Sequence, residues 1–102
     1  MIYVIATVDC KDNCKEAYLD VLSKNVSNVK AEKGCLRYEP TLDVDSGVAM
    51  QGGVRKNVVT IVEAWEDLDA LHNHFKAPHM LAYREKAKDL VNQVTIQVLK
   101  PV

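Results

Sequence analysis

Strand-like and helix-like stretches follow one another in a fixed order along the chain, and that order limits the fold more than any other feature. Residues 2–8 alternate, with Val4 on one face and Ile5 on the other, and both faces are mostly apolar. Such a pattern predicts a strand that is covered on both sides. After Asn13 the apolar spacing changes to steps of three and four, which predicts one amphipathic helix. Its apolar stripe holds Tyr18, Val21, Leu22, Val26 and Val29.

Sequence signals mark the ends of this helix and the strand that follows it. Asn13 and Glu16 have the spacing of a capping box, which predicts the helix start there. Gly34 suits the C-terminal end, where glycine is the preferred residue. Residues 35–44 then alternate again and predict a second strand. Pro40 lies inside this run and indicates an edge strand or a bulge, because proline cannot donate a hydrogen bond to a ladder.

The second half of the chain repeats the strand and helix pattern. Residues 45–57 have weak signals and are expected to form a loop that borders a pocket. Val58–Trp65 is rich in β-branched residues and is the clearest strand. Asp67 is expected to cap a short helix, and Pro78 to end that helix and open another that runs to about residue 90. Residues 94–99 alternate and predict the last strand.

The resulting order, βαββαβ in about 100 residues, predicts an α+β fold of the ferredoxin-like plan. Residues 1–102 form a single domain, with a four-stranded antiparallel sheet and helices on one face. The strands carry apolar residues on the second face as well, more than water-exposed strands usually do. We therefore expect this face to pack against the same face of a second copy, giving a homodimer with twofold symmetry.

Composition and charge exclude several classes of function. The chain is 48% apolar and 26% charged, and its formal net charge is -1. Because Lys and Arg are scattered, nothing indicates nucleic acid as a partner. The apolar N-terminus is too short to span a membrane and resembles no export signal, so a cytoplasmic location is expected. The three cysteines are then expected to be reduced thiols.

The stretch from Glu63 to Met80 holds the only Trp, the only Phe and all three His of the chain. His74 lies near the predicted C-terminal end of one helix, where the partial negative charge favours imidazolium, and His79 lies in the first turn of the next helix, where neutral imidazole is favoured. Opposed environments of this kind predict an acid and base pair, with His79 as base and His74 as cationic donor. The alternative is two solvated surface histidines.

A metal site is not expected from these histidines. His72 and His74 are two residues apart and point in different directions on a helix, while Pro78 separates His79 from both, so no pair shares one helical face. Cys10 and Cys14 lack two further ligands at suitable spacing. Nor does the chain contain a glycine-rich phosphate loop or a nucleophile elbow that would indicate a nucleotide or flavin site.

Residues around the histidine pair are candidates for substrate contacts. Trp65 ends a strand and would need a partner for its indole N–H if it were buried, so it suits either the core or a pocket wall. Tyr83 lies one turn after His79 and is a candidate to bind a substrate oxygen, with core packing as the alternative. Arg84 is a further candidate, with a plain surface charge as the alternative. The expected contacts also include Tyr38, Leu71, Phe75 and Met80.

Four segments together resemble the antibiotic biosynthesis monooxygenase domain: EKGCLRYEP, VEAWEDLDALHNHFKAPHM, the AYREKAK helix and the closing VTIQVLKP. The resemblance covers nearly the whole chain and is nearest to the bacterial quinol monooxygenase branch. It implies a dimer of ferredoxin-like subunits that oxidises a dihydroxy-aromatic with O₂ and needs no metal, flavin or haem. A quinol that is deprotonated in a dry pocket reduces O₂ itself, so the protein need supply only a base, an anion-stabilising donor and a water-excluding cavity.

Other branches of the family imply other functions. The haem-degrading branch has a histidine near the position of Arg84 and an asparagine at the position of Thr7, and both departures argue against haem. The branch that isomerises the phosphorylated autoinducer-2 signal shares two histidines around a proline, but generally has tyrosine at the position of Trp65. A dimeric module that binds a small molecule without catalysis is the third possibility.

Overall fold

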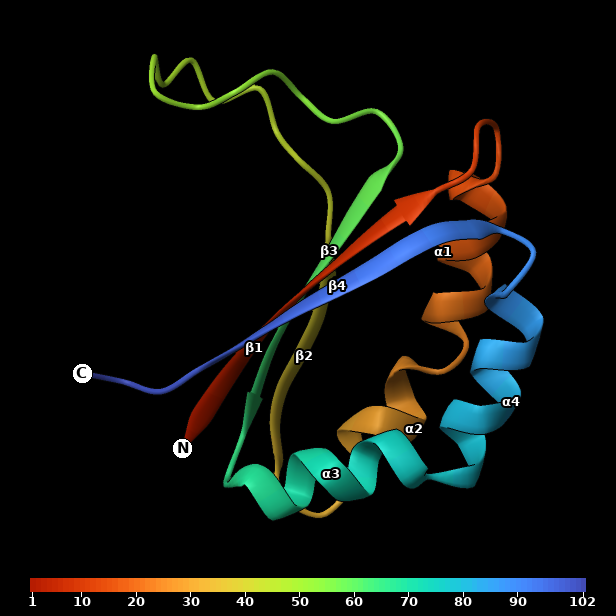
Figure 1. Ribbon diagram of the computed structural model, residues 1–102, viewed down its shortest axis with the longest axis vertical. Helices are drawn as coiled ribbons and strands as arrows, with labels where there is room; N and C mark the ends of the chain where they lie inside the picture. Colours follow the sequence, from red (N-terminus) through yellow and green to blue (C-terminus); the bar gives the residue numbers. More distant parts are fainter.

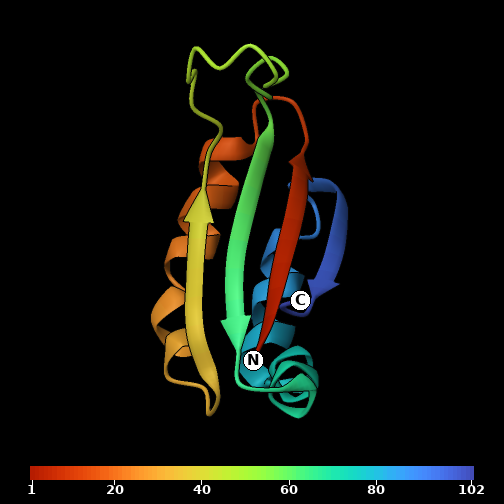
Figure 2. The same cartoon turned by 90° about the vertical axis from the view of Figure 1, so that its left-hand side faces the viewer.

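Eight elements follow one another in the computed structural model, which describes all residues 1–102. They are β1 (Ile2–Cys10), α1 (Lys15–Ser23), α2 (Val26–Lys30), β2 (Cys35–Thr41), β3 (Val58–Trp65), α3 (Leu68–Lys76), α4 (Pro78–Ala87) and β4 (Val91–Leu99). The strands form one antiparallel sheet in the order β2-β3-β1-β4. All helices lie on one face of it, and Figure 2 shows the other face uncovered. The predicted α+β ferredoxin-like fold is confirmed.

The core lies between the sheet and the helices (Figure 1). Val4, Ala6 and Val8 of β1 are at most 5% exposed and point toward the helices. In β4 the residues paired with them are Val98, Ile96 and Val94, which therefore share this face. These three remain 40–53% exposed. The helices thus cover the centre of the sheet well and leave the apolar β4 edge partly open.

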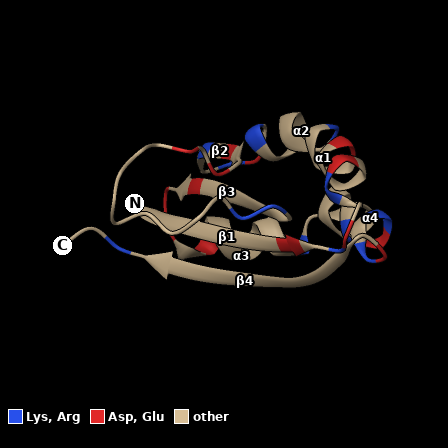
Figure 3. Ribbon diagram, turned by 90° about the horizontal axis from the view of Figure 1, so that it is seen from above, with Lys and Arg blue, Asp and Glu red and all other residues tan.

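The second face of the sheet has an apolar centre. Ile5 lies in register with Val62 of β3, and Tyr3 lies in register with Leu99 of β4. Figure 3 shows that charged residues concentrate on the helices and loops, while β1 and β4 are nearly free of them. None of the helices has the length and apolar character needed to cross a membrane.

The first helical unit differs from the prediction in its division and in its N-terminal cap. It is divided into α1 and α2 around Asn25, whose side chain is 7% exposed and bonds inside the protein instead of continuing the helix. The Asn13 capping box is wrong: Asn13 adopts a left-handed backbone conformation with φ of 63°, and the helix begins after Cys14 with no side-chain cap. Asparagine tolerates this conformation well.

Gly34 does not end a helix, because α2 stops at Lys30. Its positive φ of 86° instead turns the chain into β2, and a Cβ built there would lie 2.6 Å from the Cβ of Ala70. Glycine is therefore required both by backbone conformation and by the close approach of α3.

The expectation of an edge strand at Pro40 is confirmed, because β2 lies at the edge of the sheet and Pro40 pairs with Ile61 in regular register. A register shift occurs in β2 as well, but between Cys35 and Arg37. The strand is shorter than predicted and ends at Thr41, so Leu42 and Val44 belong to the following loop. That loop runs away from the helices (Figure 1), and Arg55 closes its base with hydrogen bonds of 2.8 and 2.9 Å to Asp43.

The second helical unit follows the prediction closely. The side chain of Asp67 accepts a hydrogen bond of 2.8 Å from the backbone N–H of Ala70, as expected for the cap of α3. Pro78 is the first residue of α4. The break between the two helices therefore places His74 in the last turn of one and His79 in the first turn of the next.

Candidate active site

An apolar cavity of about 380 Å³ lies between the sheet and helices α3 and α4. Nine of its twelve lining residues are hydrophobic. The strand residues that line it share the helix-facing side of the sheet, as their register shows. The lining residues are Ala6, Val8, Tyr38, Ile61, Glu63, His74, Phe75, Met80, Tyr83, Arg84, Val94 and Ile96. A cavity of this size and lining suits a small, largely apolar ligand.

His74 lies in the wall of this cavity and is 2% exposed. Its Nδ1 is 2.8 Å from Oε2 of Glu32, so a hydrogen on Nδ1 is donated to the carboxylate. This contact fixes the ring and leaves Nε2 as the nitrogen able to accept a proton. The ring also packs against Trp65, with their centroids 4.7 Å apart.

Burial determines the charge state of His74. Burial lowers the pKa of its imidazole, and the hydrogen bond to Glu32 opposes this only in part. This direction is opposite to the one expected from its position at the C-terminal end of α3, because loss of hydration outweighs the helix dipole. His74 therefore has the character of a neutral base, not of a cationic donor.

His79 does not line the apolar cavity. Its Nδ1 is 3.1 Å from Oδ1 of Asn25. Its Nε2 is 3.0 Å from Oε2 of Glu32, although the two are not aligned as a hydrogen bond. Both ring nitrogens thus lie close to oxygen atoms. The ring of His74, and not that of His79, lies in the cavity wall, so the geometry favours His74 as the base, whereas the helix dipoles favoured His79.

Trp65 and Glu63 form a buried pair beside His74. The indole Nε1 of Trp65 donates a hydrogen bond of 2.9 Å to Oε1 of Glu63, which supplies the partner that a buried Trp requires. Trp65 is fully buried and does not itself line the cavity, whereas Glu63 is 5% exposed and does. Burial raises the pKa of the Glu63 carboxyl to about 7, against the opposing effect of the Trp65 hydrogen bond.

Five of the seven expected contact residues line the cavity: Tyr38, Phe75, Met80, Tyr83 and Arg84. Trp65 and Leu71 are instead core residues.

The polar groups among the lining residues are held in place by neighbours. The hydroxyls of Tyr83 and Tyr18 are hydrogen-bonded to each other. Burial raises the pKa values of Tyr38 and Tyr83, so their hydroxyls stay protonated at neutral pH. Arg84 donates a hydrogen bond of 2.7 Å to the backbone oxygen of Phe75.

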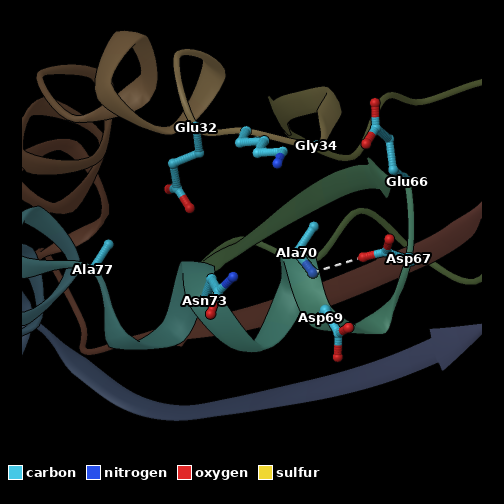
Figure 4. A pocket seen from close by; sticks show the side chains of 9 residues that line it. Glu32, Gly34, Glu66, Asp67, Asp69, Ala70, Asn73 and Ala77 are labelled. Atoms are coloured by element: carbon cyan, nitrogen blue, oxygen red, sulfur yellow. Dashed lines mark hydrogen bonds between the residues drawn. The ribbon is translucent and has the colours of Figure 1, made fainter.

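A second hollow, of about 420 Å³, lies on the other side of Glu32 and is rich in acidic groups (Figure 4). Glu66, Asp67 and Asp69 surround it, and Figure 4 shows Glu32 reaching toward it from the segment before β2. Its polar lining does not suit an aromatic ligand. No three His, Cys, Asp or Glu side chains gather anywhere in the chain in a way that could hold a metal ion.

The loop at residues 42–57 borders a pocket, as expected, but this pocket is separate from the apolar cavity. The hollow found there, of about 270 Å³, is lined by loop residues alone.

Glu32 and Glu63 are the site residues that sequence reasoning missed. Glu32 lies 42 positions before His74, and no local pattern connects the two. Glu63 did carry a signal: it shares one face of a strand with Val59 and Ile61, both buried, so an acid interrupts an otherwise apolar face.

Sequence comparisons match this chain to one protein family over most of its length. A family model described as antibiotic biosynthesis monooxygenase matches residues 1–86. Proteins of Escherichia coli K12 and Shigella flexneri, each named "Probable quinol monooxygenase YgiN", are 35% identical to this chain over 99% of its length and 98% of theirs.

Solved structures show the same fold. PA3566 from Pseudomonas aeruginosa is 26% identical, with a TM-score of 0.83 over 99% of this chain and 93% of that one. Rv0793 from Mycobacterium tuberculosis is 24% identical, with a TM-score of 0.81 over 99% of this chain and 94% of that one.

Proposed function

The chain belongs to the antibiotic biosynthesis monooxygenase family, and from this premise we propose that it oxidises a small quinol or another dihydroxy-aromatic with O₂ and without a prosthetic group. The observation that carries the proposal is a buried imidazole, oriented by a carboxylate, in the wall of an apolar cavity of about 380 Å³. The name of the relatives at 35% identity supports a quinol as the substrate class.

The reaction balances with O₂ as the only co-substrate. A naphthohydroquinone and one O₂ give a hydroxynaphthoquinone and one water. The quinol loses four electrons and O₂ gains four, so no external reductant is needed. Removal of a hydroxyl proton makes the ring electron-rich enough to donate an electron to O₂, and exclusion of water favours combination of the two radicals over release of superoxide.

His74 is proposed as the base in this reaction. Its Nδ1 is held by Glu32, so Nε2 accepts the proton of a bound hydroxyl. Glu32 is a positioning residue, and His79 is proposed to complete the pair from outside the cavity, with its Nε2 3.0 Å from the same Glu32 oxygen, Oε2, that contacts His74. Tyr38 and Tyr83 are protonated donors for the oxygen that gains negative charge.

Two alternative functions fit the cavity less well. An isomerase of a phosphorylated autoinducer-2-like signal would also use two imidazoles, but Arg84 is the only cationic side chain that stays charged among the lining residues, and nine hydrophobic neighbours do not suit a phosphate. A binding module without catalysis would use the same apolar wall. It would not require His74 to be hydrogen-bonded to a carboxylate.

We also propose that the protein acts as a homodimer formed through the second face of the sheet. The support is the apolar centre of that face, where Ile5 and Val62 lie in register and no helix covers them (Figure 2). A partner there would remove these side chains from water.

The experiment is a comparison of His74→Ala with His72→Ala in O₂ uptake on menadiol, with protein treated with a chelator. His74→Ala should lower kcat by roughly 10²- to 10⁴-fold, the range for loss of a general base. His72→Ala is the matched control, because His72 lies on the same helix and is exposed, and it should keep the wild-type rate. If the wild-type protein and the His74 variant had equal rates, His74 would not be the base of the reaction.

A further inference from the structure

We propose that Glu63 is a second proton acceptor of the cavity, which takes a hydroxyl proton from the bound dihydroxy-aromatic. The inference rests on the proposed function and deepens it. A quinol has two hydroxyl groups, and both lose their protons on the way to a quinone. His74 is proposed to accept one of these protons. The family resemblance names no residue that accepts the other.

The position of Glu63 carries the inference. It lies on β3 in register with Tyr38 of β2, which also lines the cavity. Among all Asp and Glu residues of the chain, Glu63 is the only one that is buried. Burial of a carboxyl group in an apolar wall costs free energy unless its oxygens are fully bonded, and the one hydrogen bond it receives is from Trp65 to Oε1.

A structural role alone explains this arrangement poorly. Trp65 needs one acceptor for its Nε1, and the neutral amide of glutamine at position 63 would supply it without the cost of a buried acid. The carboxyl group offers in addition a second oxygen and the ability to change charge. Both properties are useful where the side chain lines a cavity that binds a proton donor.

The surroundings of Glu63 raise the pKa of its carboxyl group to a value close to neutral pH. Glu32 faces it from the segment before β2 and raises its pKa further, after burial as the main cause. Tyr38 on β2 and Tyr83 on α4 are protonated neighbours whose own pKa values it helps to raise. His74 on α3 and Arg84 on α4 line the same cavity. A carboxyl with a pKa of about 7 is matched to proton transfer at neutral pH.

The step itself is a proton transfer. The O–H bond of one quinol hydroxyl breaks, an O–H bond forms on the Glu63 carboxylate, and the quinol keeps the electron pair as a quinolate. Trp65 and His74 are in ring contact, and Trp65 also holds Glu63. Trp65 therefore contacts both proposed proton acceptors, His74 through its ring and Glu63 through Nε1.

The test is Glu63→Gln, which keeps shape and an acceptor for Trp65, with Glu66→Gln as control. Glu66 is exposed and does not line the cavity. On menadiol, Glu63→Gln should lower kcat by roughly 10²- to 10⁴-fold with little change in KM. Residual activity should lose the acidic limb of the kcat profile that titrates near pH 7 in the wild type. A wild-type kcat and an unchanged pH profile in the variant would overturn the inference.

A binding measurement separates this inference from the proposed function. The probe is 2-hydroxy-1,4-naphthoquinone, a coloured anion at neutral pH, titrated by absorbance. Its Kd for the wild type should rise up to tenfold for each pH unit above about 7, because an ionised Glu63 repels the anion. Glu63→Gln should bind with a Kd that does not change over this range. If no quinol is oxidised, the proposed function fails, and the same pH dependence of Kd in both proteins would overturn the role of Glu63.

Discussion

Glu63 and His74 are both buried, and in both the pKa shift favours the neutral form. Burial raises the pKa of Glu63 and lowers that of His74. Their effects on stability therefore have opposite pH dependence. Glu63 stabilises the fold at acid pH and His74 at pH values above its ordinary range. Near neutral pH the His74 imidazole is therefore neutral and able to accept a proton, while the Glu63 carboxyl, with a pKa of about 7, is present in both its protonated and its ionised form.

The stability effect of Glu63 is measurable. Its pKa is about 7 in the folded protein and 4.5 ordinarily, so the stabilisation is complete below the ordinary value and is lost as the pH rises through 7. At about 1.4 kcal/mol per pKa unit, the free energy of unfolding should fall by about 2 to 3 kcal/mol between about pH 5 and pH 8.

Glu63→Gln removes this dependence, because glutamine does not titrate. Urea unfolding of the wild type and the variant at both pH values gives the difference directly. The gain in stability of the variant relative to the wild type should grow by that same amount from the acid to the alkaline condition. A difference that stays constant with pH would mean that the Glu63 carboxyl is hydrated in the folded protein.

Among the individual residues of the site, the sequence predicted the two histidines but not the carboxylates beside them, Glu32 and Glu63. His74 and His79 could be found because all the histidines lie in one short stretch beside a proline. Glu32 could not, since its contact with His74 spans 42 positions and depends on the turn at Gly34. The charge expected for His74 was wrong because helix position says nothing about burial.

The elements were predicted well where their periodicity was undisturbed. β3 and the start of α4 follow the expected boundaries, because β-branched residues and Pro78 leave few alternatives. The first helical unit was predicted as one helix, but it is interrupted before α2 at Asn25, whose side chain is held by His79 and by the sulfur of Met80. That break is a tertiary effect, and local spacing cannot reveal it.

The uncovered face of the sheet leads to a prediction about dimer formation in solution. In sedimentation equilibrium the wild type should behave as a dimer, and Ile5→Glu should be a folded monomer. Ile5 lies at the centre of that face and outside the buried core cluster, so a charge there opposes association more than folding. Leu81→Glu is the control, because Leu81 is 58% exposed on α4. A wild-type monomer, or a dimeric Ile5 variant, would contradict the proposed interface.

At the scale of the whole molecule, the order of elements was enough to predict the fold, because few topologies accommodate βαββαβ in one small domain. The cavity was not predictable in the same way. It exists because the helices leave the β4 edge partly open, so that Val94 and Ile96 join a wall completed by α3 and α4. Its size follows from packing of distant segments, which sequence spacing does not report.

The central claim is that this cavity lets a quinol react with O₂ using only side chains of the protein. The most direct test is incubation of chelator-treated protein with menadiol under isotopically labelled O₂, with product mass and O₂ uptake measured together. We expect one O₂ consumed per quinol and one labelled oxygen atom in a hydroxynaphthoquinone product. An unlabelled quinone with hydrogen peroxide, at the rate found without protein, would contradict it.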